Sequence, residues 1–88
     1  MMGYRRGKDR VHDELLALKG RIREKKTSYR GLSEATGISV NALNNKINGY
    51  TAMDTDEVQK LAAVLDIDAN DIVKYFFPSI IAKRNIKI

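Results

Sequence analysis

The sequence contains no cysteine, a single histidine and no long apolar run. Without cysteine, neither a disulfide framework nor a cysteine zinc site can supplement the core, and a reducing compartment is compatible. His12 has no second histidine or cysteine with which to form a nucleophilic dyad or a metal site. We therefore expect no enzyme, no bound metal and no cofactor. No stretch can span a bilayer, and the N-terminus lacks the apolar segment of a signal peptide, which predicts a cytoplasmic protein.

The length of 88 residues predicts one domain with a small core. The net charge of the chain, +5, is distributed unevenly along the sequence. Residues 1–52 carry eleven Lys or Arg and five Asp or Glu, residues 53–78 carry two and six, and residues 79–88 carry three and none. A basic end suits the neutralisation of nucleic-acid phosphates. Ordinary solubility is the alternative explanation, although it does not require the signs to segregate.

Two short helices joined by a tight turn are predicted in the middle of the sequence, in SYRGLSEATGISVNALNNKING. Ser28 is expected to cap the first helix, in which Leu32 and Ala35 fall on one face. Gly37 follows where the chain must leave that helix with a positive φ, and Ser39 is expected to cap the second helix. This order of signals is typical of a helix-turn-helix that binds duplex DNA, although such folds also occur without DNA binding.

The second of these helices is rich in amides. Leu43 and Ile47 repeat at i, i+4 and are expected to face the core. The other faces carry Val40, Asn41, Asn44, Asn45 and Asn48. Asn is a poor helix former, but its side chain offers the donor and acceptor pair that reads an adenine edge in the major groove. The alternative is that these amides only solvate a surface helix.

Three further helices are predicted from the apolar spacing. The first covers roughly residues 11–26, with an apolar seam formed by Val11, Leu15, Leu18 and Ile22. The fourth begins at Asp54 or Thr55, and its buried face is expected to contain Val58, Leu61, Ala62 and Leu65. The fifth is capped by Asp68, ends before Pro78 and has as inward residues Ile72, Val73 and Phe76.

Both ends of the chain carry possible binding segments. Residues 1–10 are basic and predict a flexible arm that can follow a DNA backbone, or else a disordered start without a role. The tail, residues 79–88, contains apolar residues beyond the last helix and an alternation typical of a strand. We expect this tail to help form a homodimer, by strand pairing or by packing on the fifth helix, or else to be a frayed terminus. The dimerisation residues are Ile80, Ile81, Ile86 and Ile88.

The segment LKGRIREKKTSYRGLSEATGISVNALNNKING, followed by a loop, an acidic-capped helix and YFFP, resembles the Cro and repressor proteins of temperate phages. These form the lambda-repressor-like helix-turn-helix superfamily, and the chain is most similar to small Cro-like proteins from phages and prophages of Gram-positive bacteria. The resemblance covers roughly Leu15 to Phe77. It implies an all-α, compact five-helix domain over residues 11–78 that binds double-stranded operator DNA as a dimer, with the third helix in the major groove.

The resemblance also implies which residues contact DNA. Those expected to face base edges are Val40, Asn41, Asn44 and Asn45. Near the phosphates it places Ser28, Tyr29, Asn48, Tyr50 and Thr51. The cations after the first helix suit that helix's dipole and lie beside the next helix N-terminus, so both roles are expected. The further candidates for phosphate contacts are Arg21, Lys25, Lys26, Arg30, Ser39 and Lys46.

Three positions depart from the family pattern. Relatives often carry glutamine at position 29, which is Tyr29 here. Val40 can contact a thymine methyl group but cannot make a hydrogen bond. Lys46 stands where many relatives have an apolar core residue, so its stem is expected to pack while its ammonium reaches a phosphate.

These observations lead to the hypothesis of a sequence-specific transcriptional regulator that acts by operator occupancy, with no small-molecule substrate and no membrane partner. The alternative is a protein-interaction module of the same fold, antitoxin-like or antirepressor-binding, that does not read DNA. A nonspecific DNA-coating protein is disfavoured, because such proteins rely on Lys and Arg rather than on amides.

Overall fold

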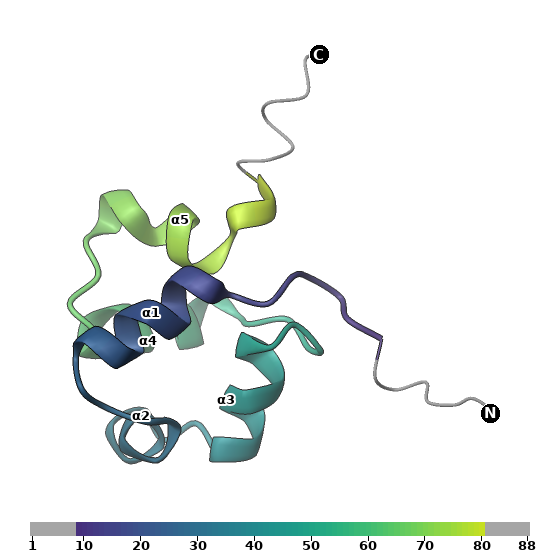
Figure 1. Cartoon of the computed structure of the whole chain (residues 1–88). Coiled ribbons are helices and arrows are strands. Elements are labelled where there is room, and N and C mark those ends of the chain that lie inside the picture. Colours follow the sequence, from purple (N-terminus) through teal and green to yellow (C-terminus); the bar gives the residue numbers. More distant parts are fainter. Residues whose placement is uncertain (1–8, 81–88) are drawn as a thin grey trace.

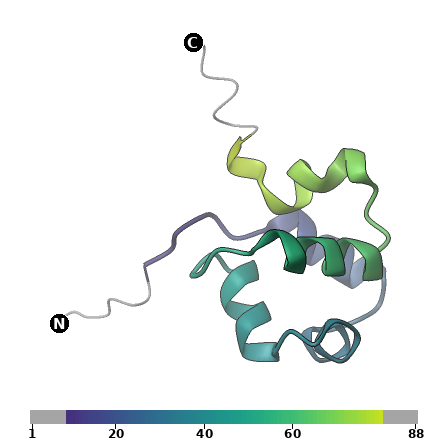
Figure 2. The same ribbon diagram turned by 180° about the vertical axis from the view of Figure 1, so that it is seen from behind.

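The computed structural model describes residues 9–80, which fold into helices without any β-strand. In chain order these are α1 (Leu16–Glu24), α2 (Tyr29–Thr36), α3 (Val40–Ile47), α4 (Thr55–Val64), the 3-10 helix η2 (Ala69–Asp71) and α5 (Ile72–Phe76). In Figure 1, α2 and α3 lie at one end of the molecule, α5 lies at the other end, and α1 and α4 lie between them. Figure 2 shows the same arrangement from behind. The predicted all-α class is confirmed for these residues.

One apolar core joins the four longer helices. The side chains with essentially no exposure are Leu18, Leu32, Leu43, Ile47, Leu61 and Leu65. Each such burial contributes about 1.5–3 kcal/mol relative to an exposed side chain. No polar or charged residue is buried within residues 9–80. The inward faces predicted for the third and fourth helices are therefore confirmed.

The helix N-termini follow the predicted capping residues. The hydroxyl oxygen of Ser28 accepts from the backbone N–H of Gly31 at 3.1 Å, and that of Ser39 accepts from Ala42 at 3.0 Å. At α4, Asp54 Oδ1 accepts from the Glu57 N–H at 2.8 Å while Glu57 Oε1 accepts from the Asp54 N–H at 2.9 Å. These reciprocal bonds form a capping box, which satisfies N–H groups that the first turn leaves without helical partners.

The prediction that the first helix begins near residue 11 was wrong, because α1 begins at Leu16. Val11 is 64% exposed, and its N–H donates to the carbonyl oxygen of Gly49 at 2.7 Å. The N–H of His12 donates to the same oxygen at 3.2 Å, and the N–H of Leu15 donates to Ile47 O at 2.9 Å. The chain before α1 therefore runs beside the end of α3 and supplies donors to carbonyls that α3 leaves unpaired. We call residues 10–15 the strap.

Three smaller differences concern helix ends and faces. α1 ends at Glu24, because Lys26 takes a positive φ of 56°. The predicted fifth helix is divided into η2 and α5, with the Asp68 side chain capping η2 through the Asn70 N–H. Val73 was predicted to face inward but is 37% exposed, and Ala35 is exposed as well. A surface helix buries one stripe of its circumference, and both residues lie off that stripe.

Candidate nucleic-acid interface

The turn between α2 and α3 is built from local signals. Gly37 adopts φ 81°, the left-handed conformation that lets the chain leave α2 without steric cost. Thr36 Oγ1 donates to Leu32 O at 2.7 Å and accepts from the Ile38 N–H at 3.2 Å. Ile38 is 8% exposed and anchors the turn in the core. The turn therefore sets the position of α3 against α2.

The outer face of α3 is uncharged and open. Val40 is 45% exposed, Asn41 and Asn44 are exposed, and Asn45 is half-buried. The opposite side of α3 is completely buried through Leu43 and Ile47. α3 contains no acidic residue. The four predicted base-reading residues thus lie on one element, and three of them are freely exposed.

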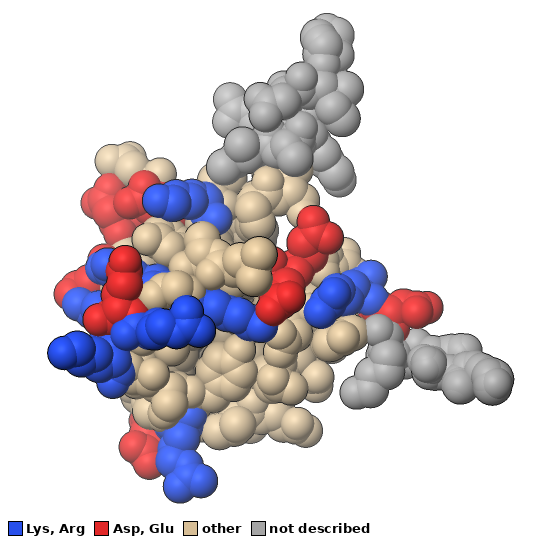
Figure 3. Space-filling view, viewed as in Figure 1, with Lys and Arg blue, Asp and Glu red and all other residues tan. Residues whose placement is uncertain are grey.

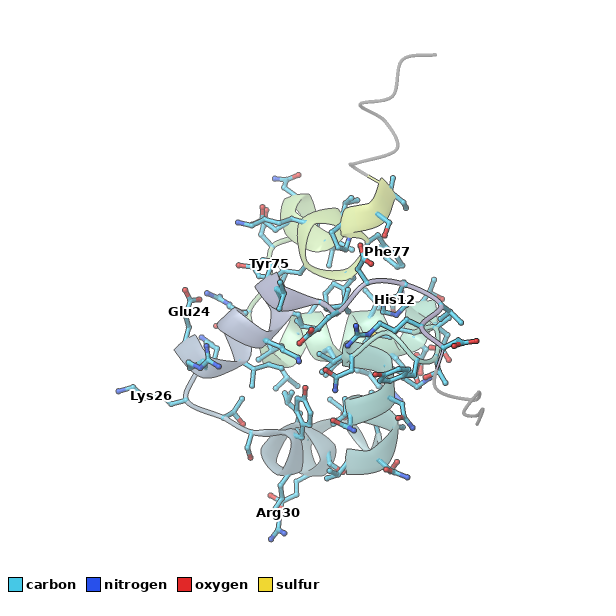
Figure 4. The ribbon with its side chains drawn as sticks, turned by 45° about the vertical axis from the view of Figure 1, so that its right-hand side comes forward. His12, Glu24, Lys26, Arg30, Tyr75 and Phe77 are labelled. Atoms are coloured by element: carbon cyan, nitrogen blue, oxygen red, sulfur yellow. The ribbon has the colours of Figure 1, made fainter. Side chains whose placement is uncertain are left out.

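Several predicted phosphate-contacting residues lie at the two ends of this α2–α3 pair. Ser28, Tyr29 and Arg30 stand at the start of α2, and Arg30 extends away from the body of the molecule in Figure 4. Partial burial raises the pKa of the Tyr29 phenol, which keeps it a neutral hydrogen-bond donor. Ser39 begins α3, and beyond its end come Asn48, Tyr50 and Thr51. Of these three, Thr51 is exposed and the other two are half-buried.

Two of the predicted phosphate-binding cations are instead held at the end of α4. Arg21 Nε donates to Leu65 O at 2.9 Å, and its Nη2 donates to Asp66 O at 2.8 Å. The ammonium of Lys25 lies 3.1 Å from the Asp66 carboxylate. Arg21 thus satisfies carbonyls at the C-terminus of α4, where cations are favoured, and Lys25 pairs with a carboxylate beside them. Lys26 is exposed at the end of α1, on the far side of the molecule from His12 in Figure 4.

Lys46 also has partners within the protein. Its ammonium lies 3.0 Å from Glu57 Oε1 and donates to Ala52 O at 3.2 Å, and its side chain is only 17% exposed. Lys46 thus connects α3 to the capping box of α4 through a shielded ion pair. Figure 3 shows blue and red side chains adjoining across α1, whereas the surface over α3 is tan.

The strap adds residues that the sequence patterns did not indicate. Arg10 Nε donates to Asn48 O at 2.8 Å, and the guanidinium carbon lies 5.2 Å from the centre of the Tyr50 ring. His12 Nε2 lies 3.2 Å from Thr51 O. The helical spacing of Val11 with later apolar residues concealed this arrangement. The sequence signal that included Arg10 was the basic character of residues 1–10.

A cluster of polar groups connects the strap to α1. The carboxylate of Glu14 accepts from the Lys19 ammonium, which also donates to Asn48 Oδ1 at 2.6 Å. The hydrogen bond from Lys19 lowers the pKa of Glu14 below its usual value of 4.5, and the charges of Lys19 and Arg10 act in the same direction. Burial opposes this shift but does not reverse it.

This shift predicts an acid-dependent loss of stability. Because the folded pKa of Glu14 is lower than the unfolded one, its contribution is complete above pH 4.5 and is lost as the pH falls through the folded pKa. Urea unfolding followed from about pH 6 downward should show a steeper acid loss for the wild type than for Glu14→Gln. Glu34→Gln is the control, since Glu34 is exposed on α2. Identical profiles for wild type and Glu14→Gln would contradict the role of this ion pair.

The predicted dimerisation residues lie mostly outside the described part of the chain. Ile81, Ile86 and Ile88 fall in residues 81–88, and most of the predicted arm falls in residues 1–8. Ile80 is described and is 47% exposed. It borders an apolar hollow of about 280 Å³ whose walls include Val11, Met53, Phe76, Phe77 and Pro78.

The described residues also show two absences. Within residues 9–80, no three His, Cys, Asp or Glu side chains gather as a potential metal-binding group. None of the helices in this range has the length and hydrophobicity needed to cross a membrane.

The fold and this surface define a small all-helical domain with a short helix pair and an exposed amide face. Residues 13–79 match the family model described as protein of unknown function (DUF739), and the chain belongs to this family. The comparison with curated proteins finds no match.

Proposed function

We propose that the protein is a sequence-specific double-stranded DNA-binding regulator with a lambda-repressor-like helix-turn-helix formed by α2 and α3. The observation that carries this proposal is the open face of α3, where Val40, Asn41 and Asn44 are exposed on a helix without acidic residues. A helix of this width enters the major groove, in which amides and methyl groups distinguish base pairs. Asn45, half-buried on the same helix, would contact the edge of the site.

The phosphate contacts follow from the two ends of the helix pair. The start of α2 offers backbone N–H groups together with Tyr29 and Arg30, and the residues after α3 offer Tyr50 and Thr51. The side-chain amide of Asn48 donates to Asn44 instead. Arg10 joins the second group through the strap. Arg21, Lys25 and Lys46 have internal partners, so their main contribution is to the long-range field rather than to direct contacts. Fewer direct contacts predict a moderate salt dependence of binding.

The proposed mode of action is operator occupancy by a homodimer in the cytoplasm. Two-fold symmetry would place two α3 helices in successive major grooves, about 34–36 Å apart. A dimer bound over a promoter would exclude polymerase without any catalytic step, cofactor or small-molecule substrate. Phage and prophage regulators of the Cro type are the class that this proposal fits.

Selection from a pool of random duplexes, followed by sequencing of the bound fraction, tests the proposal. The expected result is enrichment of a two-fold symmetric site. Retention without enrichment would replace the proposal with nonspecific DNA binding. Absence of retention at low and at physiological salt would exclude DNA binding altogether.

The proposed dimer makes a prediction about the tail. Truncation after Pro78 removes Ile80 and the later apolar residues, including Ile81, Ile86 and Ile88, and is expected to convert a dimer into a monomer. Light scattering coupled to size exclusion measures the mass, and the circular dichroism melting curve reports whether the domain remains folded. A folded truncation with unchanged oligomeric mass would place the dimer contact elsewhere.

A protein-interaction module of the same fold is the second candidate. The apolar hollow bordered by Val11, Phe77 and Ile80 favours it, as does the pairing of several cations with carboxylates inside the domain. An antitoxin-like or antirepressor-binding protein of this kind would bind a protein partner and would not retain duplex DNA in the selection.

A further inference from the structure

A chain of four polar side chains connects the strap and α1 to the outer face of α3. Glu14 binds the ammonium of Lys19, and Lys19 Nζ donates to Asn48 Oδ1 at 2.6 Å. Asn48 Nδ2 in turn donates to Asn44 Oδ1 at 2.9 Å and to the backbone oxygen of Asn44 at 2.8 Å. The last member, Asn44, is the exposed amide at the centre of the proposed reading face.

The direction of every hydrogen bond in this chain follows from its charged end. An ammonium group has three donors and no acceptor, so only the oxygen of Asn48 can face Lys19. The amide nitrogen of Asn48 must then point along α3, where it requires acceptors. Asn44 meets this requirement with its oxygen. The carboxylate of Glu14 holds the ammonium in place, and the side chains of Glu14 and Lys19 are only 33% and 26% exposed.

We propose that Lys19 is a positioning residue that sets the hydrogen-bond polarity of the Asn44 amide and thereby the base preference at the position Asn44 reads. This inference rests on the proposed DNA-binding function. With its oxygen directed toward Asn48, Asn44 presents its NH2 group outward, where it matches the N7 acceptor of a purine. This orientation therefore favours a purine at the position that Asn44 reads.

Flipping the side-chain amide of Asn44 would cost one hydrogen bond. A flipped Asn44 would direct its NH2 group at the NH2 group of Asn48, and the hydrogen bond between the two side chains would be lost. That flipped amide is the one that accepts from the N4 amino group of cytosine. The hydrogen bonds from Lys19 through Asn48 to Asn44 therefore lower the preference for cytosine, relative to a purine, by about five- to tenfold. This factor corresponds to the net free energy of one hydrogen bond.

Three substitutions of Lys19 separate its effect on hydrogen-bond direction from the packing of its side chain. Lys19→Arg keeps a group that only donates, Lys19→Gln keeps a hydrogen-bonding group that can either donate or accept, and Lys19→Met keeps only the apolar stem. The position read by Asn44 is the one whose preference disappears in Asn44→Ala. In duplex selections, we expect Lys19→Gln and Lys19→Met to lower the preference for a purine over cytosine at this position about five- to tenfold. Lys19→Arg should retain the preference, and the preferences at the other base positions should stay unchanged in all three variants. A uniform loss across all positions, or no loss with Met and Gln, overturns the proposal.

A measurement on the free protein separates this inference from the proposed function. The side-chain amide signals of Asn44 and Asn48 in ¹⁵N-edited NMR spectra should shift and exchange faster with water in Lys19→Met, but not in Lys19→Arg. If wild-type protein does not bind DNA, the proposed function fails, and the role of Lys19 in base preference fails with it. Unchanged amide signals in Lys19→Met would overturn the polar chain itself, even if wild-type protein binds a specific operator.

Discussion

Replacing Gly49 with alanine is expected to lower the free energy of unfolding by about 2–4 kcal/mol. Gly49 adopts φ 95°, a conformation that strains any residue with a Cβ atom. An added Cβ would also lie 2.1 Å from the carbonyl oxygen of His12 and 3.3 Å from the carbonyl carbon of Asp13. The strap cannot move away easily, because the N–H groups of Val11 and His12 donate to Gly49 O.

Two other glycines provide matched controls for this prediction. Gly37 has φ 81° but no atom within 4 Å of an added Cβ, so Gly37→Ala should cost only the left-handed conformation, about 1–2 kcal/mol. Gly20 lies inside α1 with open space around it, and Gly20→Ala should stabilise the protein by about 0.5–1 kcal/mol. Urea denaturation measures all three. An equal cost at Gly37 and Gly49 would show that the contact between the strap and the end of α3 is not tight in solution.

The second large effect concerns DNA affinity rather than stability. Asn44→Ala is expected to weaken binding to the selected operator by about 1–3 kcal/mol and to leave binding to a random duplex nearly unchanged. The amide of Asn44 is exposed at the middle of α3, while Asn48 still has the backbone oxygen of Asn44 as a partner after the substitution. The protein should therefore remain folded while losing base recognition.

Fluorescence anisotropy against both duplexes, at one fixed salt concentration, measures this difference. Asn70→Ala is the control, because Asn70 is also exposed but lies in η2 at the opposite end of the molecule from α3. Equal losses on operator and random DNA would assign Asn44 to the phosphate backbone. A loss with Asn70→Ala would move the interface to the other end of the domain.

Most of the features that could be predicted from the sequence, such as helix caps and helix ends, depend on interactions between residues close together in the chain. Ser28, Ser39 and Asp54 cap helices through backbone groups only three residues away, so each cap is determined within one turn of chain. Gly37 ends α2 for an equally local reason. The apolar spacing of α3 and α4 likewise identified their buried faces. It did not identify the start of α1, because Val11 continues the same spacing and yet is exposed.

The contacts that shape the proposed interface depend on long sequence separations. Arg21 binds the end of α4 across 44 residues, and Lys19 reaches Asn48 across 29. The charge of Lys46 predicted a phosphate contact, but the folded chain brings Glu57 to within 3.0 Å of it. Composition and spacing thus determined which segments form helices, the caps of α2, α3 and α4, and the amide face of α3. The partners of each cation and the path of the strap were decided by packing, because a charged side chain pairs with whichever opposite charge or carbonyl the fold brings within reach.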